Sequence, residues 1–351
     1  MMAINHIDSD LRVLTDQAIG FVSAAEGFIF LAGLMAGQVY TRKFDQGGAP
    51  EVYGRCARRA GELYLWHVGL LVFTLLWGRL AVNFLSGHPW RLPPLFFENP
   101  IVGLISGMTL IYQPGLLDIL PNYIGFLLLT PWALTRCREG RAGTLWILSG
   151  AIWAFDQLCV PSGPFISGPI NTGAFHFLSW QWLFVSGLVV GYTRETSGKL
   201  MSSPSRALLA AGVMVAGFLW MVRSPWLPNW WTPQQLIRLT DKTSIGFFRV
   251  ANFAVVAFLL GAVASRYPRW FSFGPLAFLG RYTLAAFAAH VTAAMMILTW
   301  PETFDSRAWR WADTVLMITS LFLGAAIAAW VRARRTAPKR LGLPTPAEGA
   351  S

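Results

Sequence analysis

A histidine with two acidic neighbours is the first candidate for chemistry in this chain. His6 lies in the segment NHIDSD, and Asp8 and Asp10 follow it closely. A nearby carboxylate fixes the tautomer of an imidazole and raises its basicity, as a general base requires. The pattern favours proton abstraction from a hydroxyl, although a lone histidine in a loop is more often inert.

Three arginines precede a second histidine in the segment RCARRAGELYLWH. Arg55, Arg58 and Arg59 are spaced like ligands of a phosphate, because guanidinium groups bind phosphates in a bidentate manner. His67 ends the segment and is the second catalytic candidate. The alternative is that the arginines only anchor a membrane helix at the lipid headgroups, in which case His67 is a structural residue.

Glu26 lies about two turns inside a long apolar stretch, between Ala25 and Gly27. A charge at that depth costs a few kcal/mol unless it has a partner. We therefore expect a buried pairing of Glu26 with an arginine or a histidine, and direct catalysis is the alternative. Further polar residues lie at the ends of apolar stretches, namely Asp118, Gln181, Asp241, Lys242 and His290.

Apolar stretches of about 20 residues dominate the chain, which is 54% hydrophobic and only 13% charged. One covers residues 19–40, and others start near residues 61, 143, 174, 205, 245, 274 and 311. Such a stretch, as a helix, crosses a hydrocarbon core of roughly 30 Å, and in lipid the backbone must bond internally. The predicted fold is all-α, a polytopic transmembrane bundle of about nine full spans.

Two segments depart from this regular pattern. Residues 101–112 are apolar but too short to span, and we interpret them as a re-entrant or interfacial helix that leads to a span at residues 119–134. A pocket mouth is expected near residues 113–122. Residues 1–7 resemble the last turns of a membrane helix, so a truncated first helix is expected. We predict one membrane domain over residues 1–335 and a disordered cytoplasmic tail at 336–351.

The net charge of +11 reflects topology. Most of the basic residues lie in alternate loops and in the tail, and the intervening loops are poor in lysine and arginine. This positive-inside pattern predicts an inner-membrane protein with a cytoplasmic C-terminus and argues against nucleic acid as a partner. The three cysteines and the histidines have no spacing typical of a metal site, so no metal is expected.

Several motifs, taken together and in this order, resemble an OpgC-type protein. They are NHIDSD, GFVSAAEGFIFLAGLMAG, RCARRAGELYLWH, LLDILPNYI, WQWLFVSG, DKTSIGFFR and FLGRYTLAAFAAHV. The OpgC type belongs to the acyltransferase-3 group of membrane acyltransferases. The resemblance implies a ten- or eleven-helix inner-membrane enzyme that passes an acyl group from cytoplasmic acyl-CoA to a hydroxyl of a periplasmic glycan. In OpgC proteins proper, the reaction is succinylation of osmoregulated periplasmic glucans.

The resemblance also implies roles for single residues. His6 corresponds to the catalytic base, and Arg55, Arg58 and His67 correspond to the motif at the donor site, with Arg59 beside it. Two departures bear on activity: we expect only the truncated end of the family's opening helix in this sequence, and Cys56 occupies a plausible arginine position. Residues in further family motifs are substrate-binding candidates, namely Asp118, Gln181, Asp241, Lys242 and His290.

The expected chemistry is direct transfer, because no serine or cysteine lies in a nucleophile-elbow motif. Acyl-CoA is the donor substrate, no permanent cofactor is expected, and the partners are the bilayer and the glycan acceptor. The catalytic candidates are His6, His67 and Glu26. Two other classes stay open: a glycan or small-molecule transporter or flippase, and a non-catalytic, degenerate acyltransferase-like subunit.

Overall fold

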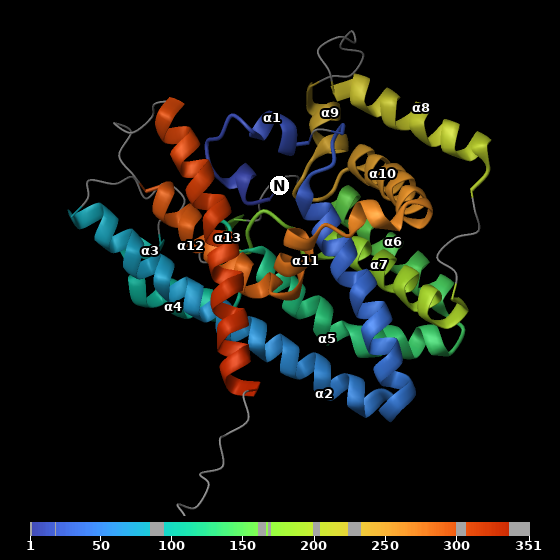
Figure 1. Cartoon of the computed structure of the whole chain (residues 1–351), viewed down its shortest axis with the longest axis horizontal. Helices are drawn as coiled ribbons and strands as arrows, with labels where there is room; N and C mark the ends of the chain where they lie inside the picture. The colour runs from blue at the N-terminus through green and yellow to red at the C-terminus, as the bar shows by residue number, and fades with distance from the viewer. Residues whose placement is uncertain are drawn as a thin grey trace, which may run out of the picture.

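Helices make up almost all of the structure, a computed structural model (Figure 1). It describes residues 2–17, 19–84, 95–160, 166–167, 170–198, 204–223, 233–299 and 307–336. The elements, in chain order, are η1 (Ile4–His6), α1 (Arg12–Thr15), α2 (Ala24–Phe84), α3 (Leu95–Glu98), α4 (Pro100–Met108), α5 (Ile119–Arg138), α6 (Ala142–Cys159), β1 (Ile166–Ser167), β2 (Ile170–Asn171), α7 (Phe177–Ser197), α8 (Arg206–Arg223), α9 (Pro233–Thr240), α10 (Phe247–Arg266), η2 (Pro268–Phe271), α11 (Gly274–Arg281), α12 (Thr283–Ile297) and α13 (Arg307–Thr336). The two short strands pair in antiparallel fashion.

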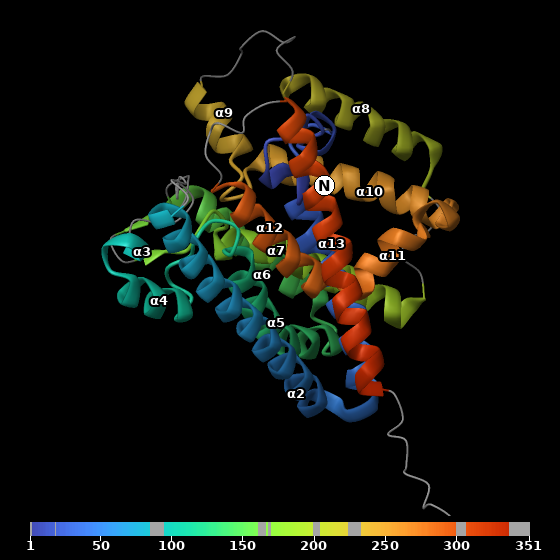
Figure 2. The same cartoon turned by 60° about the vertical axis from the view of Figure 1, so that its left-hand side comes forward.

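The 61 residues of α2 form two arms that meet at a sharp bend. Gly48 lies at the bend with a φ of 66°, and Pro50 follows inside the next arm. Glycine adopts a positive φ without steric cost, and proline is well suited to the first turn of a helix. Figure 2 shows the two arms meeting at the lower end of the molecule. The basic segment after residue 41 is therefore helical on both sides of the bend.

Four described helices are long and apolar enough to cross a membrane, which indicates a membrane protein. Their ranges are Ala24–Phe84, Arg206–Arg223, Phe247–Arg266 and Ala308–Thr336. Helices α5, α6 and α7 have 20, 18 and 21 residues, but polar residues lower their hydropathy. The predicted count of nine full spans is thus not confirmed and stays a prediction.

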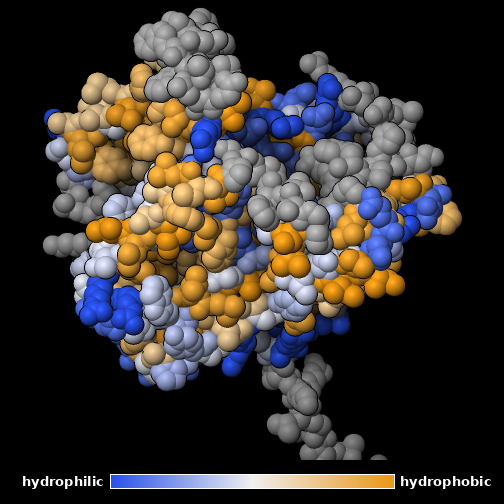
Figure 3. Space-filling view, turned by 180° about the vertical axis from the view of Figure 1, so that it is seen from behind, coloured by the Kyte–Doolittle hydropathy of each residue, from blue (hydrophilic) through white to orange (hydrophobic). Residues whose placement is uncertain are grey.

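The molecular surface carries many large apolar side chains. Leu65 is 72% exposed and Leu158 is 80% exposed, and both lie on long helices. Figure 3 shows apolar residues over most of the middle of one face, with hydrophilic residues along its lower edge. An apolar surface this extensive is unfavourable in water, and lipid is the solvent in which it is stable.

Two predicted segments differ from the structure, and one matches it. The expected span near residue 274 is divided at Tyr282 into α11 and α12, and α12 has only 15 residues. Residues 4–6 form a single 3-10 turn, where two α-helical turns were expected. The short helix predicted at residues 101–112 is present as α4, with nine residues. The predicted tail at 336–351 lies outside the described residues except for Thr336, which ends α13.

Helices α2 and α7 cross in very close contact through two pairs of glycines. A Cβ atom at Gly33 would lie 2.0 Å from the carbonyl oxygen of Phe184, and one at Gly187 would lie 2.1 Å from that of Phe30. Gly37 and Gly191 are equally crowded one turn further along. Small residues four apart are typical of helix pairs in membranes, where the lack of side chains lets the backbones touch.

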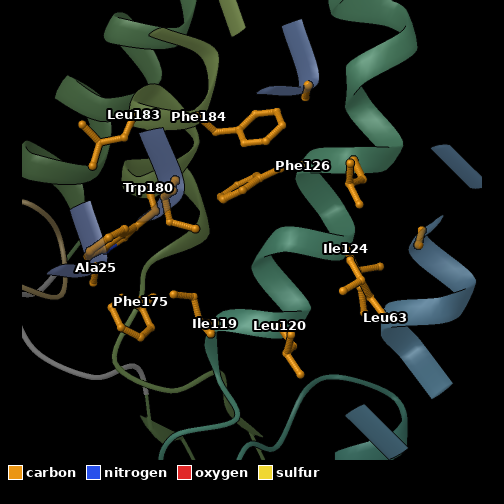
Figure 4. Packing of buried hydrophobic residues seen from close by; sticks show 14 of the residues in the cluster. Ala25, Leu63, Ile119, Leu120, Ile124, Phe126, Phe175, Trp180, Leu183 and Phe184 are labelled. Atoms are coloured by element: carbon orange, nitrogen blue, oxygen red, sulfur yellow. The ribbon is translucent and has the colours of Figure 1, made fainter. Parts of the chain in front are cut away.

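The core lies beside this crossing, between α2, α5 and α7. The rings of Phe126 and Phe184 stack with centroids 5.2 Å apart, and Phe175 meets Trp180 edge to face. Figure 4 shows these rings together with Leu63 from the second arm of α2. Both arms of α2 therefore contribute side chains to the same core.

Three basic segments lie at one end of the bundle. Arg42, before the bend of α2, pairs with Glu195 at the end of α7 at 3.5 Å. Arg138, at the end of α5, pairs with Asp45 near the bend. The bend, the turn between α5 and α6, and the end of α7 are thus neighbours, as loops on one side of a membrane would be.

The α2–α7 crossing predicts that replacing a glycine by alanine affects stability very differently at the crossing and away from it. Gly187→Ala places a methyl group against a backbone oxygen and should lower the free energy of unfolding by about 1–3 kcal/mol. Gly69→Ala on α2 is the control, because nothing lies within 4 Å of its added Cβ. It should be neutral or stabilising by up to about 1 kcal/mol. Thermal unfolding in detergent measures both, and equal melting temperatures would contradict the crossing.

Candidate functional site

Two of the predicted histidines meet in space. The rings of His6, in η1, and His290, in α12, stack with centroids 5.4 Å apart and an angle of 22° between their planes. Phe287 also contacts the ring of His290, edge to face. Ala3 and Ile7 flank His6 in the sequence and pack in one apolar cluster with residues of α12 and α13. The N-terminal segment is thus held where it presents His6 to α12.

Hydrogen bonds fix this N-terminal segment from its other side. The amide of Asn5 donates to the carbonyl oxygen of Thr15 at 3.1 Å, and the hydroxyl of Thr15 donates back to Asn5. Asp8 pairs with Arg12 at 3.6 Å, and Asp10 pairs with Arg310 of α13 at 3.5 Å. Both acidic residues predicted to orient His6 therefore also take part in ion pairs.

His67, on the second arm of α2, is fully buried and holds the end of α4. Its Nε2 lies 3.2 Å from the carbonyl oxygen of Gly107, and the hydroxyl of Tyr64 donates to that of Met108 at 3.1 Å. Among the described residues, Nδ1 of His67 has no hydrogen-bond partner. His290 is similar, since its buried Nε2 also lacks one within the described chain.

The loop between α4 and α5 carries a third buried group of this kind. Leu110 and Leu116 have positive φ angles of 65° and 74°, so the loop is tightly constrained. The backbone N–H of Gln113 donates to the carbonyl oxygen of Asn171. The side chain of Gln113 is 1% exposed, and neither amide atom has a hydrogen-bond partner in the part of the chain described.

Asp118 and Lys242, both predicted to bind substrate, are electrostatic neighbours at the end of this loop. Asp118 accepts a hydrogen bond from the backbone N–H of Ala174 at 2.7 Å. Burial raises the pKa of Asp118 to about 6, although the Ala174 bond and the charge of Lys242 oppose the rise. Leu116, two residues earlier, packs against the apolar cluster that contains Ile7. The structure thus brings the Asp118 loop beside the segment that carries His6.

Asp241 precedes Lys242 and organises its own loop. Its carboxylate accepts hydrogen bonds from the hydroxyls of Thr243 and Ser244 at 2.5 and 2.7 Å. Burial alone would raise the pKa of Asp241, but these bonds outweigh it, so the pKa is lowered and the group stays charged. The carboxylate shapes the loop that presents Lys242, which is exposed.

The three arginines predicted to bind the donor lie on the second arm of α2, close to the bend. Arg55 pairs with Glu51 and Arg59 with Glu62, each at 2.5 Å, and Arg58 is exposed. A phosphate at this site would compete with the two glutamates for the guanidinium groups.

Glu26 has the buried basic partner that its depth predicts. Its Oε1 lies 2.5 Å from Nη1 of Arg249 in α10, and neither side chain is more than 4% exposed. Its Oε2 accepts from both the backbone N–H and the hydroxyl of Ser23, which closes the first turn of α2 as a capping box. Arg249 also donates to the carbonyl oxygens of Phe21 and Thr240. These contacts fasten the start of α2 to α10.

A second buried network lies outside the predicted site residues. Nδ1 of His176 lies 3.1 Å from Oδ2 of Asp156, and the hydroxyl of Ser179 donates to the same oxygen at 2.5 Å. His176 and Ser179 each bond to the carboxylate of Asp156. In a catalytic triad the serine bonds to the histidine and the histidine bonds to the carboxylate, so this geometry is different. The signal in the sequence was two ionisable residues at the ends of apolar stretches. Gln181 lies elsewhere, bonded to Ser149 of α6.

The Glu26 pair predicts a strong effect on stability. Glu26→Gln leaves Arg249 charged, buried and without its ion-pair partner, which should cost about 3–5 kcal/mol of unfolding free energy. Glu51→Gln, which breaks the exposed pair with Arg55, should cost under about 1 kcal/mol. Thermal unfolding of the two variants side by side measures the difference. A stable Glu26→Gln protein that has lost activity would instead favour a catalytic role for Glu26.

The comparisons agree with this arrangement of motifs. A family model described as OpgC protein matches residues 1–336. No curated protein and no solved structure matches the chain. Because the family model covers nearly the whole sequence, the chain belongs to the OpgC family.

Proposed function

We propose that this protein is an integral membrane O-acyltransferase that moves an acyl group from cytoplasmic acyl-CoA to a hydroxyl of a periplasmic glycan. Membership of the OpgC family indicates an acyltransferase-like role. The observation that carries the finer proposal is the contact of His6 with His290 beside the loop of Asp118. A succinyl group and an osmoregulated periplasmic glucan are the donor group and acceptor that the family suggests.

The paired histidines suit a general base. Two cationic rings 5.4 Å apart would repel each other, and this favours a neutral imidazole, the form that can accept a proton. In the proposed step, His6 removes the proton of the acceptor hydroxyl, and the hydroxyl oxygen attacks the carbonyl carbon of the thioester. The carbon–sulfur bond then breaks, and the CoA thiolate leaves and receives the proton. Asp118 and Lys242 are the candidates that hold the sugar.

The donor is proposed to bind at the opposite end of the second arm of α2. Arg55, Arg58 and Arg59 would contact the phosphates of CoA through the charge-assisted bonds that guanidinium groups form. His67 lies eight residues beyond Arg59, which is about 12 Å along a helix. The acyl arm would extend in this direction, toward the loop that carries Gln113.

Passage of the acyl arm requires a change of packing. Between Arg59 and His67, the side chains of Ala60 and Leu63 are buried in the core against α5. We propose that the second arm of α2 and α5 part at Leu63 when the donor binds. Lids and helix shifts of this kind are common in enzymes that exclude water from a reactive group.

Removal of the base tests the reaction. His6→Ala should lower the rate of acyl transfer by about 10²–10⁴-fold, because that is the usual contribution of a general base. Val13→Ala, a change at an 82% exposed side chain of the same segment, should leave the rate unchanged. Transfer from radiolabelled succinyl-CoA to a glucan, with purified protein in vesicles, is the measurement. Full activity of His6→Ala would remove this residue from the mechanism, and transport of glucan without acylation would favour the flippase alternative.

The proposed donor site predicts that changes at Arg59 and at Glu62 alter the affinity for acyl-CoA in opposite directions. Arg59→Gln removes a phosphate ligand and should weaken binding of a non-hydrolysable acyl-CoA analogue by about 10-fold, as expected for one lost charge-assisted bond. Glu62→Gln frees Arg59 from its ion pair and should strengthen binding. Calorimetry at two salt concentrations measures both affinities. If both variants bind as the natural protein does, the donor site lies elsewhere.

A further inference from the structure

A groove opens on the lipid-facing surface between α5, α6 and α7. It encloses about 230 Å³, and its lining is almost entirely apolar, with Leu129 and Trp132 from α5, Leu148 and Ile152 from α6, and Leu178 from α7. These five side chains are also partly exposed at the molecular surface. The groove therefore opens toward the bilayer and is separate from the proposed reaction site.

The polar side chains of the groove favour a hydrocarbon occupant. Ser149 and Gln181 line it, but the hydroxyl of Ser149 donates to Oε1 of Gln181 at 2.6 Å. Nε2 of Gln181 in turn donates to the carbonyl oxygens of Ser149 and Leu178. Since these groups bond to one another, the lining is suited to an alkyl chain rather than to a sugar or a nucleotide.

One end of the groove lies next to a basic turn. Trp132 lines the groove, and the guanidinium group of Arg136 lies 5.9 Å from its ring. Leu145, also in the lining, is one helical turn after Arg141. Arg136 and Arg141 share a single carboxylate, that of Glu139, at 2.8 and 3.6 Å. The turn thus keeps a net positive charge where the groove ends.

The guanidinium group of Arg136 can be reached from the molecular surface, because its side chain is 36% exposed. A phosphate diester is the anion that guanidinium groups bind well, and tryptophan is common at the depth of the lipid headgroups. Basic pockets between membrane helices bind anionic lipid headgroups for these reasons.

We infer that this groove binds an anionic glycerophospholipid from the leaflet next to the basic end of the bundle. One acyl chain lies in the groove between α5, α6 and α7. The phosphate of the headgroup contacts Arg136 and Arg141, and Trp132 lies at the boundary between chain and headgroup. The inference uses no residue of the proposed reaction.

Native mass spectrometry of the full chain tests this inference. The protein is purified from vesicles that contain phosphatidylglycerol and phosphatidylcholine in equal amounts, and the retained lipids are counted. We expect retention to favour phosphatidylglycerol. The double change Arg136→Gln/Arg141→Gln should lower the preference for phosphatidylglycerol by about 5-fold for each arginine removed. This factor corresponds to the usual attraction between one basic residue and an anionic lipid surface. Arg266→Gln/Arg269→Gln removes the same charge from exposed positions and should leave the preference unchanged.

A third variant tests the groove itself. Leu148→Trp fills the groove from an exposed position and should reduce retention of both lipids several-fold without changing the melting temperature by more than a few degrees. Equal retention of the two lipids by the natural protein would overturn the inference, as would equal losses in the two arginine variants. A Leu148→Trp protein that keeps both lipids, or a protein that retains acyl-CoA in place of phospholipid, would overturn the placement of the chain.

Discussion

The contact between α2 and α7 is the constraint on which the rest of the structure depends. Backbones can touch there only because Gly33 and Gly37 face Gly187 and Gly191 with no side chain between them. In lipid, where apolar side chains gain little from mutual contact, this close packing supplies much of the association of the two helices. This contact fixes the first arm of α2, whose start is bonded to Arg249 of α10 through Glu26 and whose other end is the bend at Gly48. The second arm, with its arginines and His67, is positioned by the same contact.

Buried polar groups in this protein fall into two classes that differ in energy. Glu26, Asp156 and Gln181 have their hydrogen bonds made within the protein, so their desolvation is offset and they tie helices together. His67, Gln113 and His290 each have at least one buried polar atom without a partner among the described residues. A buried polar atom in that condition costs about 1–3 kcal/mol, and such atoms call for a functional explanation. The second class lies along the proposed path from the donor site to His6, whereas Glu26, the acidic residue most conspicuous in the sequence, belongs to the first class and ties α2 to α10.

Local patterns predicted much of the fold. The lengths of the apolar stretches anticipated α5, α6, α7, α8 and α10, and the shortness of residues 101–112 anticipated α4. The break at Tyr282 was missed because the polar run at residues 280–283 is short and apolar residues continue on both sides of it. The glycine pairs were visible at a spacing of four, yet nothing local says that Gly33 meets Gly187, because that choice is made by packing over the whole bundle. The same holds for His6 and His290, which are brought together only when the N-terminal segment packs between α12 and α13.

The two ends of the proposed reaction are joined by one helix arm, and this has a consequence for coupling. Arg59 near the bend and His67 near α4 lie on the same rigid element, so a shift that opens the core at Leu63 also moves the contact of His67 with Gly107. Gly107 lies in the last turn of α4, and the loop that follows runs through Gln113 to Leu116, which packs against the segment of His6. If the core opens in this way, donor binding at the arginines would reach the histidine pair through a short series of packed neighbours, which is one physical route for coupling between separate sites. A static site would need no such series, and the buried, unpartnered atoms along it would have no explanation.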